Sequence, residues 1–348
     1  MTNTSKSTRI LAYDMIRIAA IFAVVMIHSS SAYISAPVHT LDFFLGDIME
    51  SLSRIGVPLF IMLSGALLLN ENKEFNFQKM KQYCIRIFIL LYIWSFLFAI
   101  FYEILIPLVG NHPISIKEFL YSFIFGQYHQ WYLFMIIGLY LITPILKLFI
   151  KQENRKYIEW FILLSIVFRF SVPIMNLLSN TLTNTTDIMA NYVNQYSLQF
   201  VDPNLTYFFL GWYFTNCSLS KKQKNTIYVL GFLALMTTIL GNYLLPTASS
   251  VFYSGVSANT LFYAAALFLF LYTREWKNVP TKWVNLLSKM SFGIYLVHPI
   301  WLTILKQLPI SEAAIIRIPF NWIGSMVLSL VTVYIMSNIP VIKKLVKI

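Results

Sequence analysis

The sequence predicts an all-α polytopic membrane protein with about ten transmembrane helices and both termini in the cytoplasm. Of its 348 residues, 58% are apolar and only 11% are charged, and apolar runs recur from end to end. Soluble domains carry about 25% charged residues, so a water-soluble globule is excluded. One integral membrane domain is expected over residues 1–348, with its membrane core at about 10–340.

Ten apolar stretches are candidates to cross a bilayer, which takes about 20 apolar residues in a helix. They lie at about 11–33, 51–70, 84–108, 130–150, 157–178, 204–219, 226–246, 257–273, 284–306 and 317–339. The stretch at 116–126 is also apolar but short. We therefore expect it to re-enter the membrane or to lie at its outer interface.

The basic residues support this arrangement, because most of the 26 Lys and Arg fall in alternate connecting segments. These segments hold Lys6 and Arg9; Lys73, Lys79, Lys81 and Arg86; Lys147, Lys151, Arg155 and Lys156; Lys221, Lys222 and Lys224; Arg274, Lys277, Lys282 and Lys289; and Lys343, Lys344 and Lys347. The positive-inside rule places them in the cytoplasm. The net charge of +12 is thus an orientation signal, and we expect no nucleic-acid partner.

The segments expected outside, at about 34–49 and 179–203, are polar in another way. The first carries Asp42 and Asp47, and the second is rich in Asn and Tyr. Such side chains suit a neutral ligand with hydroxyl groups, such as a sugar, although a merely solvated loop explains them as well. The two cysteines, Cys84 and Cys217, lie far apart without metal-ligand spacing, so we expect inert thiols and no metal.

The first predicted helix carries ionisable groups that are costly in a membrane and are therefore functional candidates. Arg17 and His28 are 11 residues apart, which places them about 20° from each other around the helix and about 16 Å apart along it. Arg17 is suited to a phosphate-bearing ligand from the cytoplasm, and His28 to a base near the outer face. The alternative is structural: an interfacial ion pair of Asp14 with Arg17, and a hydrogen-bonded His28.

Other polar positions fall near the outer side. Arg54 opens the second predicted helix and either faces an acceptor pocket or snorkels to the interface. His129 begins the fourth at about the depth of His28, beside Trp131, which favours a shared acceptor site or an aromatic belt. His298 precedes Pro299, whose ring disrupts the helical hydrogen-bond ladder. His298 has either a role in the site or a buried hydrogen bond.

Five blocks of sequence resemble the acyltransferase-3 family of integral membrane acyltransferases, in order and over nearly the whole chain. They are YDMIRIAAIFAVVMIH at 13–28, SRIGVPLFIMLSGALLL at 53–69, HQWYLFMIIGLYLITPI at 129–145, YFFLGWYF at 207–214 and SFGIYLVHPI at 291–300. The first contains the family's pattern of Arg, ten residues and His. Within the family, the chain is most similar to the enterobacterial-common-antigen O-acetyltransferase type.

The resemblance implies transfer of an acyl group, usually acetyl, from cytoplasmic acyl-CoA to a hydroxyl of an extracytoplasmic glycan or lipid-linked sugar. It implies that His28 is the catalytic histidine and Arg17 its partner. Asp14, Lys81 and Arg86 are expected on the donor side, the last two by a loose match to a paired-arginine segment. Gln130 departs from the family block, which commonly has Leu after His129.

Acetyl-CoA would be a co-substrate, and no permanently bound cofactor is expected. The expected partners are acyl-CoA, the glycan acceptor and membrane lipids, and the expected location is a cell membrane, such as the bacterial cytoplasmic membrane. Direct transfer and an acyl-histidine intermediate both stay open. A rival function is a transporter that exports a cell-surface glycan intermediate, although its cue, discontinuous helices in two corresponding halves, is not seen.

Overall fold

The computed structural model describes residues 4–183, 188–245 and 249–347, and these residues contain helices but no strands. The all-α class is therefore confirmed. The helices are α1 (Thr4–Ser30), α2 (Leu41–Ser53), α3 (Gly56–Leu68), α4 (Phe77–Ile100), α5 (Ile106–Gly110), α6 (Ile116–Phe125), α7 (Trp131–Phe149), α8 (Arg155–Ser165), α9 (Val172–Thr183), α10 (Ile188–Gln195), α11 (Pro203–Asn216), α12 (Lys221–Leu244), α13 (Ser249–Phe252), α14 (Ala258–Thr273), α15 (Thr281–Lys306) and α16 (Ala314–Asn338). A C-terminal 3₁₀ turn, η7, spans Ile342–Leu345.

Among the described residues, seven helical segments are long and apolar enough to cross a membrane. They are Leu11–Ser30, Leu41–Leu68, Phe77–Gly110, Trp131–Phe149, Gln152–Leu182, Lys221–Leu244 and Ala314–Asn338. All ten predicted stretches coincide with helices. However, the stretches at 204–219, 257–273 and 284–306, which fall on α11, α14 and α15, are not among the seven. α11 and α14 have only 14 and 16 residues, and both are largely buried against other helices.

The start of the second predicted stretch is wrong. Residues 41–53 form the helix α2 instead of an outer loop, and Asp47 and Glu50 on it are fully buried. Thr40 begins the helix, since its side chain accepts a hydrogen bond from the backbone N–H of Phe43. The carboxylates interrupt the apolar run in the sequence, but inside the protein Glu50 pairs with Arg54 and Asp47 Oδ1 accepts hydrogen bonds from Tyr253 and Asn242. After a short break at 54–55, the chain continues as α3.

The short apolar stretch at 116–126 folds as α6, whose ten residues are too few to cross a bilayer. It packs along α4. Ser115 caps its first turn, and Gly126, at a φ of 73°, ends it in a conformation that favours glycine. This is the short, non-spanning element that the sequence predicts.

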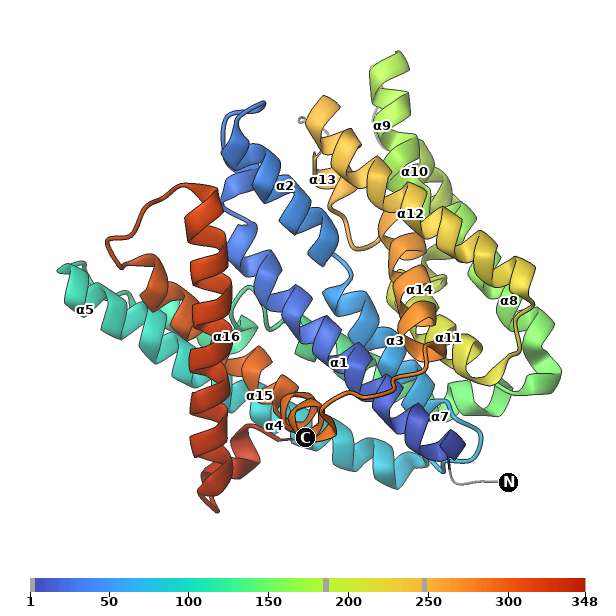
Figure 1. Cartoon of the computed structure of the whole chain (residues 1–348), viewed down its shortest axis with the longest axis horizontal. Coiled ribbons are helices and arrows are strands. Elements are labelled where there is room, and N and C mark those ends of the chain that lie inside the picture. The colour runs from blue at the N-terminus through green and yellow to red at the C-terminus, as the bar shows by residue number, and fades with distance from the viewer. Residues whose placement is uncertain (1–3, 184–187, 246–248, 348) are drawn as a thin grey trace.

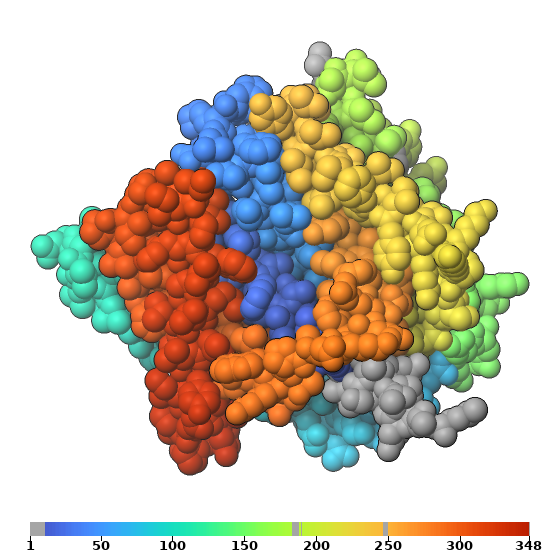
Figure 2. Space-filling model, in the orientation of Figure 1, coloured from blue at the N-terminus to red at the C-terminus, as the bar shows by residue number. Residues whose placement is uncertain are grey.

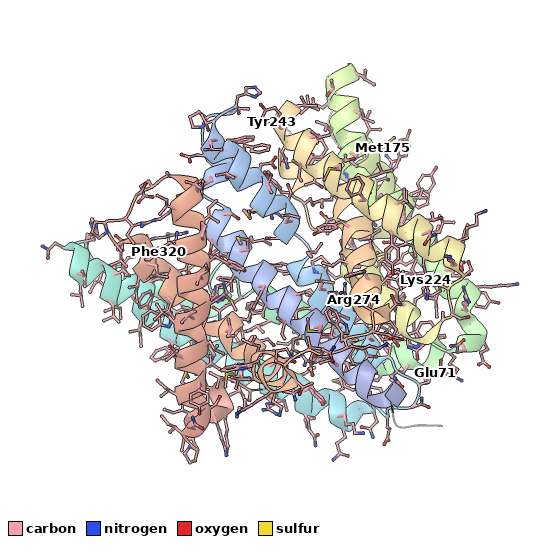
Figure 3. All side chains as sticks on the ribbon, viewed as in Figure 1. Glu71, Met175, Lys224, Tyr243, Arg274 and Phe320 are labelled. Carbon is pink, nitrogen blue, oxygen red and sulfur yellow. The ribbon has the colours of Figure 1, made fainter. Side chains whose placement is uncertain are left out.

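The helix that carries Arg17 and His28 runs through the middle of the bundle. In Figure 1, α1 crosses the centre of the view, and it packs against α2, α3, α14, α15 and α16. Figure 2 shows α1 in dark blue at the bottom of a furrow between α16 in red and α14 in orange. Figure 3 shows Tyr243 at the top of the view and Glu71 at the lower right, close to the N-terminal end of the described chain. The side chains of Lys6 and Arg9 lie outside the described residues.

A close helix crossing fixes α3, the next wall of the site. A Cβ atom added to Gly65 would lie 1.8 Å from the carbonyl oxygen of Phe208 on α11, and one added to Gly211 would lie 1.7 Å from that of Met62. Only glycine permits this approach at both positions. The crossing holds α3 and its Ser64 in a fixed place beside α1.

Candidate active site

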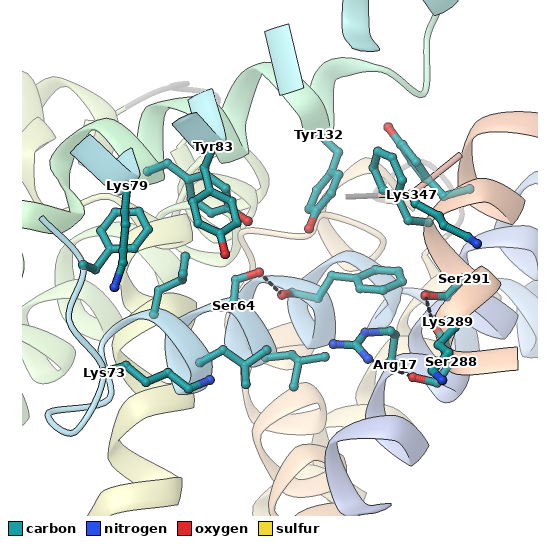
Figure 4. A pocket seen from close by; sticks show the side chains of 18 of the residues that line it. Arg17, Ser64, Lys73, Lys79, Tyr83, Tyr132, Ser288, Lys289, Ser291 and Lys347 are labelled. Carbon is teal, nitrogen blue, oxygen red and sulfur yellow. Dashed lines mark hydrogen bonds between the residues drawn. The ribbon is translucent and has the colours of Figure 1, made fainter. Parts of the chain in front are cut away.

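A cavity of about 870 Å³ opens beside the N-terminal half of α1, and Arg17 lies in its wall. Its other walls come from α3, the segment 69–76, α4, α7, α15 and the C-terminal residues. In Figure 4, Arg17 and Tyr132 point into the same space from opposite sides. The predicted inward direction of Arg17 is therefore what the structure shows.

Arg17 is held from two sides through its Nη1 atom. This nitrogen donates to Ser288 Oγ at 2.8 Å and lies 3.3 Å from Asp14 Oδ1. The Ser288 hydroxyl in turn donates to the same Asp14 oxygen at 2.5 Å. Within the described residues, Nε and Nη2 make no such bond, so these donors are available to an anion in the cavity.

The cavity is strongly cationic. Besides Arg17, the described residues that line it include four lysines and a single acidic residue: Lys73, Lys79, Lys289, Lys347 and Glu74. Glu74 lies 3.8 Å from Lys79 and offsets one of these charges. A site of this composition suits a ligand with several phosphates.

Lys147 on α7 holds the segment that contributes Lys73 and Glu74, although it does not line the cavity itself. Its Nζ atom donates to three backbone carbonyls, of Leu68 at 3.4 Å, Asn70 at 2.7 Å and Lys73 at 2.6 Å. These carbonyls belong to the end of α3 and the loop after it, where a cation is favourable. The sequence alone predicts Lys147 only as one of the basic residues that set the orientation in the membrane.

Three of the five histidines, His28, His129 and His298, form a cluster near the C-terminal end of α1. The ring of His298 is stacked on that of His28 at 5.3 Å between centroids, and the ring of His129 lies 5.9 Å from that of His298. Tyr128 covers His28 edge-on at 5.1 Å. The sequence prediction that His28 and His129 share a depth is consistent with this cluster.

His298 has a fixed orientation that the following proline explains. Its Nδ1 atom lies 2.8 Å from the carbonyl oxygen of Tyr295 and 3.1 Å from that of Ile294. Because Pro299 has no N–H, the Tyr295 carbonyl lacks its usual helical donor and is free for this bond. A carbonyl can only accept, so Nδ1 carries the hydrogen and Nε2 is left as an acceptor. In the described residues Nε2 has no partner.

Tyr132 and Tyr295 separate the cavity from the histidines. Their rings meet edge-to-face at 5.6 Å, and both line the cavity, whereas His28, His129 and His298 do not. The Tyr295 hydroxyl donates to the backbone carbonyl of His129 at 2.7 Å. Arg17 and His28 therefore lie on either side of a pair of aromatic rings.

The structure separates several predicted site residues from this centre. Lys81 and Arg86 line a different hollow. Lys81 lies two residues after Lys79 and so about 200° around α4 from the cavity wall. Arg86 instead donates from Nη2 to the backbone carbonyl of Lys347 at 2.9 Å. Trp131 is 50% exposed on the outside of the bundle, as expected of an aromatic belt. The neighbouring Gln130 is buried, and its Oε1 accepts from the backbone N–H of Gln127 at 2.8 Å, so it holds the turn before α7.

Arg54 does not open a helix but follows the end of α2. It pairs with Glu50 and lies over the ring of Tyr253 at 4.9 Å. Glu50 also accepts from Ser30, two residues after His28, at 2.8 Å. The neighbouring Asp47 accepts from the Tyr253 hydroxyl at 2.5 Å. Arg54 thus belongs to a largely buried network against the C-terminal end of α1.

The fold and this site define a class: a multi-pass membrane protein with a cationic cavity at one end and a buried histidine cluster next to it. A model of the acyltransferase-3 family, described as an acyltransferase domain, matches residues 10–338, and the chain belongs to this family. No curated protein and no solved structure matches it. The family match confirms the resemblance seen in the sequence and supports a membrane acyltransferase.

Proposed function

We propose that this protein transfers a short acyl group, such as acetyl, from acyl-CoA in the cytoplasm to a hydroxyl of a glycan or lipid-linked sugar outside. The single observation that carries the proposal is the pair of sites on α1, a cationic cavity at Arg17 and a histidine cluster at His28. The protein would lie in a cell membrane, such as the bacterial cytoplasmic membrane.

The cavity supports a coenzyme A donor. Its lysines and Arg17 would bind the phosphates, with Asp14 and Ser288 holding the guanidinium in place. The pantetheine arm would then extend along α1 toward His28, over the roughly 16 Å that separates the two residues on the helix. Because Tyr132 and Tyr295 close the cavity on this path, their rings must part for the thioester to reach the histidines.

His28 is proposed as the general base. It would take the proton of the acceptor hydroxyl while the oxygen attacks the thioester carbonyl. The resulting tetrahedral intermediate collapses with cleavage of the carbon–sulfur bond, and the imidazolium returns the proton to the coenzyme A thiolate. His298, stacked on His28, would position its ring, and Arg54 would support the outer end of α1 on the acceptor side.

The decisive test replaces His28 and compares it with a histidine outside the cluster. Membranes that contain the protein are supplied with acetyl-CoA and a sugar acceptor, and the release of coenzyme A is measured by its free thiol. We expect His28→Ala to lower the rate at least about 100-fold, as loss of a general base does. His112→Ala, on the segment between α5 and α6, should retain activity. Normal turnover by correctly inserted His28→Ala protein would refute the assignment.

A second experiment decides between direct transfer and an acyl-histidine intermediate. The protein is mixed with acetyl-CoA labelled in the acetyl group, without acceptor, and quenched within milliseconds. Direct transfer predicts no label on the polypeptide. Label that depends on His28 would instead establish a covalent intermediate.

A further inference from the structure

A second hollow, of about 910 Å³, lies between α4 and the C-terminal turn η7. It shares no lining residue with the cavity at Arg17. Among the residues that the structure describes, three cations line it, Lys81, Arg86 and Lys344, and no acidic residue does. We refer to it as the α4–η7 groove.

The groove is polar at one end and apolar along its length. Lys81, Ile85, Ile89 and Ile93 follow one another at intervals of four residues and so form one stripe on α4. The stripe lies within a segment that is long and apolar enough to span a membrane. From Lys81 to Ile93 it covers about 18 Å, close to the roughly 15 Å of hydrocarbon in one leaflet.

The far wall of the groove is anchored to α4. The indole Nε1 of Trp94 donates to the backbone carbonyl of Leu345 at 2.9 Å, and Arg86 Nη2 donates to that of Lys347 at 2.9 Å. Lys344 faces the groove, whereas Lys347 faces the donor cavity. The wall between the two hollows is thus a short, fixed piece of chain.

We propose that the α4–η7 groove binds one anionic phospholipid from the leaflet at this end of the protein. Its phosphate would lie between Lys81, Arg86 and Lys344, and an acyl chain would lie along the isoleucine stripe. A charged end without acids matches an anionic headgroup. An apolar wall of one leaflet's depth matches a lipid chain and has no counterpart in a soluble phosphate. This inference is independent of the acyl-transfer reaction.

The test measures lipid binding to the purified full-length protein in detergent by native mass spectrometry. Phosphatidylglycerol and phosphatidylcholine are titrated separately. We expect tighter binding of phosphatidylglycerol, and a loss on the order of 10- to 30-fold in the double variant Lys81→Gln, Lys344→Gln. The matched control is Lys156→Gln, Lys282→Gln, which removes two exposed cations outside the groove and should leave binding unchanged. Equal losses in both double variants, or no preference in the wild type, would overturn the proposal.

The apolar part of the groove is tested separately. Ile89→Trp should fill it and weaken phosphatidylglycerol binding while all cations stay in place. Its control, Val331→Trp on α16, changes a residue of similar exposure, 49% against 51%, that is not in the groove. If Ile89→Trp binds phosphatidylglycerol as the wild type does, the chain does not lie along the stripe and the proposal fails.

Coenzyme A is the other phosphate-bearing ligand to be measured. Its affinity for the Lys81→Gln, Lys344→Gln variant, obtained by calorimetry, should equal that of the wild type. A loss of coenzyme A binding with unchanged lipid binding would assign the groove to the donor and would also overturn the proposal.

Discussion

Replacing Lys147 by methionine tests whether a residue outside the cavity organises the donor site. The lysine donates to three carbonyls of the segment that carries Lys73. A hydrogen bond to a charged group contributes about 1.5–3 kcal/mol when buried, and exposure reduces this. For a half-buried lysine we take about 2 kcal/mol for the three bonds together. If half of this is carried into donor binding, the KM for acetyl-CoA rises about fivefold.

The assay is steady-state coenzyme A release at varied acetyl-CoA concentration. Because Lys147 contacts neither the cavity nor the histidines, kcat should change little. Lys147→Arg keeps the positive charge, so its KM for acetyl-CoA should rise less than that of Lys147→Met. The matched control is Lys151→Met, which removes an exposed lysine whose ion pair within the described chain is with Glu153 at 3.7 Å. An unchanged KM in Lys147→Met, or the same rise in Lys151→Met, would refute the positioning role.

Three further predictions concern the walls of the site. Arg17→Lys should raise the KM for acetyl-CoA by about tenfold or more in the coenzyme A release assay, because an ammonium lacks the planar fork that binds phosphate; an unchanged KM would contradict this. Pro299→Ala restores a helical N–H that competes with His298 for its carbonyl, so kcat should fall while the KM for acetyl-CoA stays the same, and a changed KM alone would count against it. Gly211→Ala places a methyl group against a backbone carbonyl of α3. It should lower the free energy of unfolding in detergent by about 1–3 kcal/mol or more, which is read as a lower melting temperature. Gly138→Ala should keep the wild-type stability, because no described atom lies within 4 Å of its added Cβ. If Gly211→Ala and Gly138→Ala melted at the same temperature, the close crossing of α3 and α11 would be refuted.

The fold class could be predicted because hydropathy and charge act locally along the chain. The same method misplaced the start of α2, where Asp47 and Glu50 interrupt an apolar run. Two partners of Asp47 lie far away in the sequence: Asn242 and Tyr253 donate to its Oδ1 at 3.1 and 2.5 Å. Hydropathy assigns a carboxylate to water, and only the tertiary structure shows that Asp47 accepts these hydrogen bonds inside the protein.

Some residues of the candidate site could likewise be predicted from the sequence, and others could not. The spacing of Arg17 and His28 on one helix was sufficient to predict that they face the same side, because helix geometry relates them directly. Ser288 could not be found, since it reaches Arg17 from 271 residues away. Lys81 and Arg86 were grouped with Arg17 by charge and by family likeness, but their direction around α4 depends on the register of that helix against its neighbours.

The arrangement also determines which parts of the proposed site can move. Arg17 and His28 belong to one continuous helix, so their separation along it is constant and the helix cannot bring donor and base together. The path between them is closed by Tyr132 on α7 and Tyr295 on α15, and both of these helices contain an internal proline, Pro144 and Pro299. A helix is most easily bent at a proline. In the proposed reaction, α7 and α15 would therefore move to admit the thioester, while α1 would keep Arg17 and His28 at a constant distance.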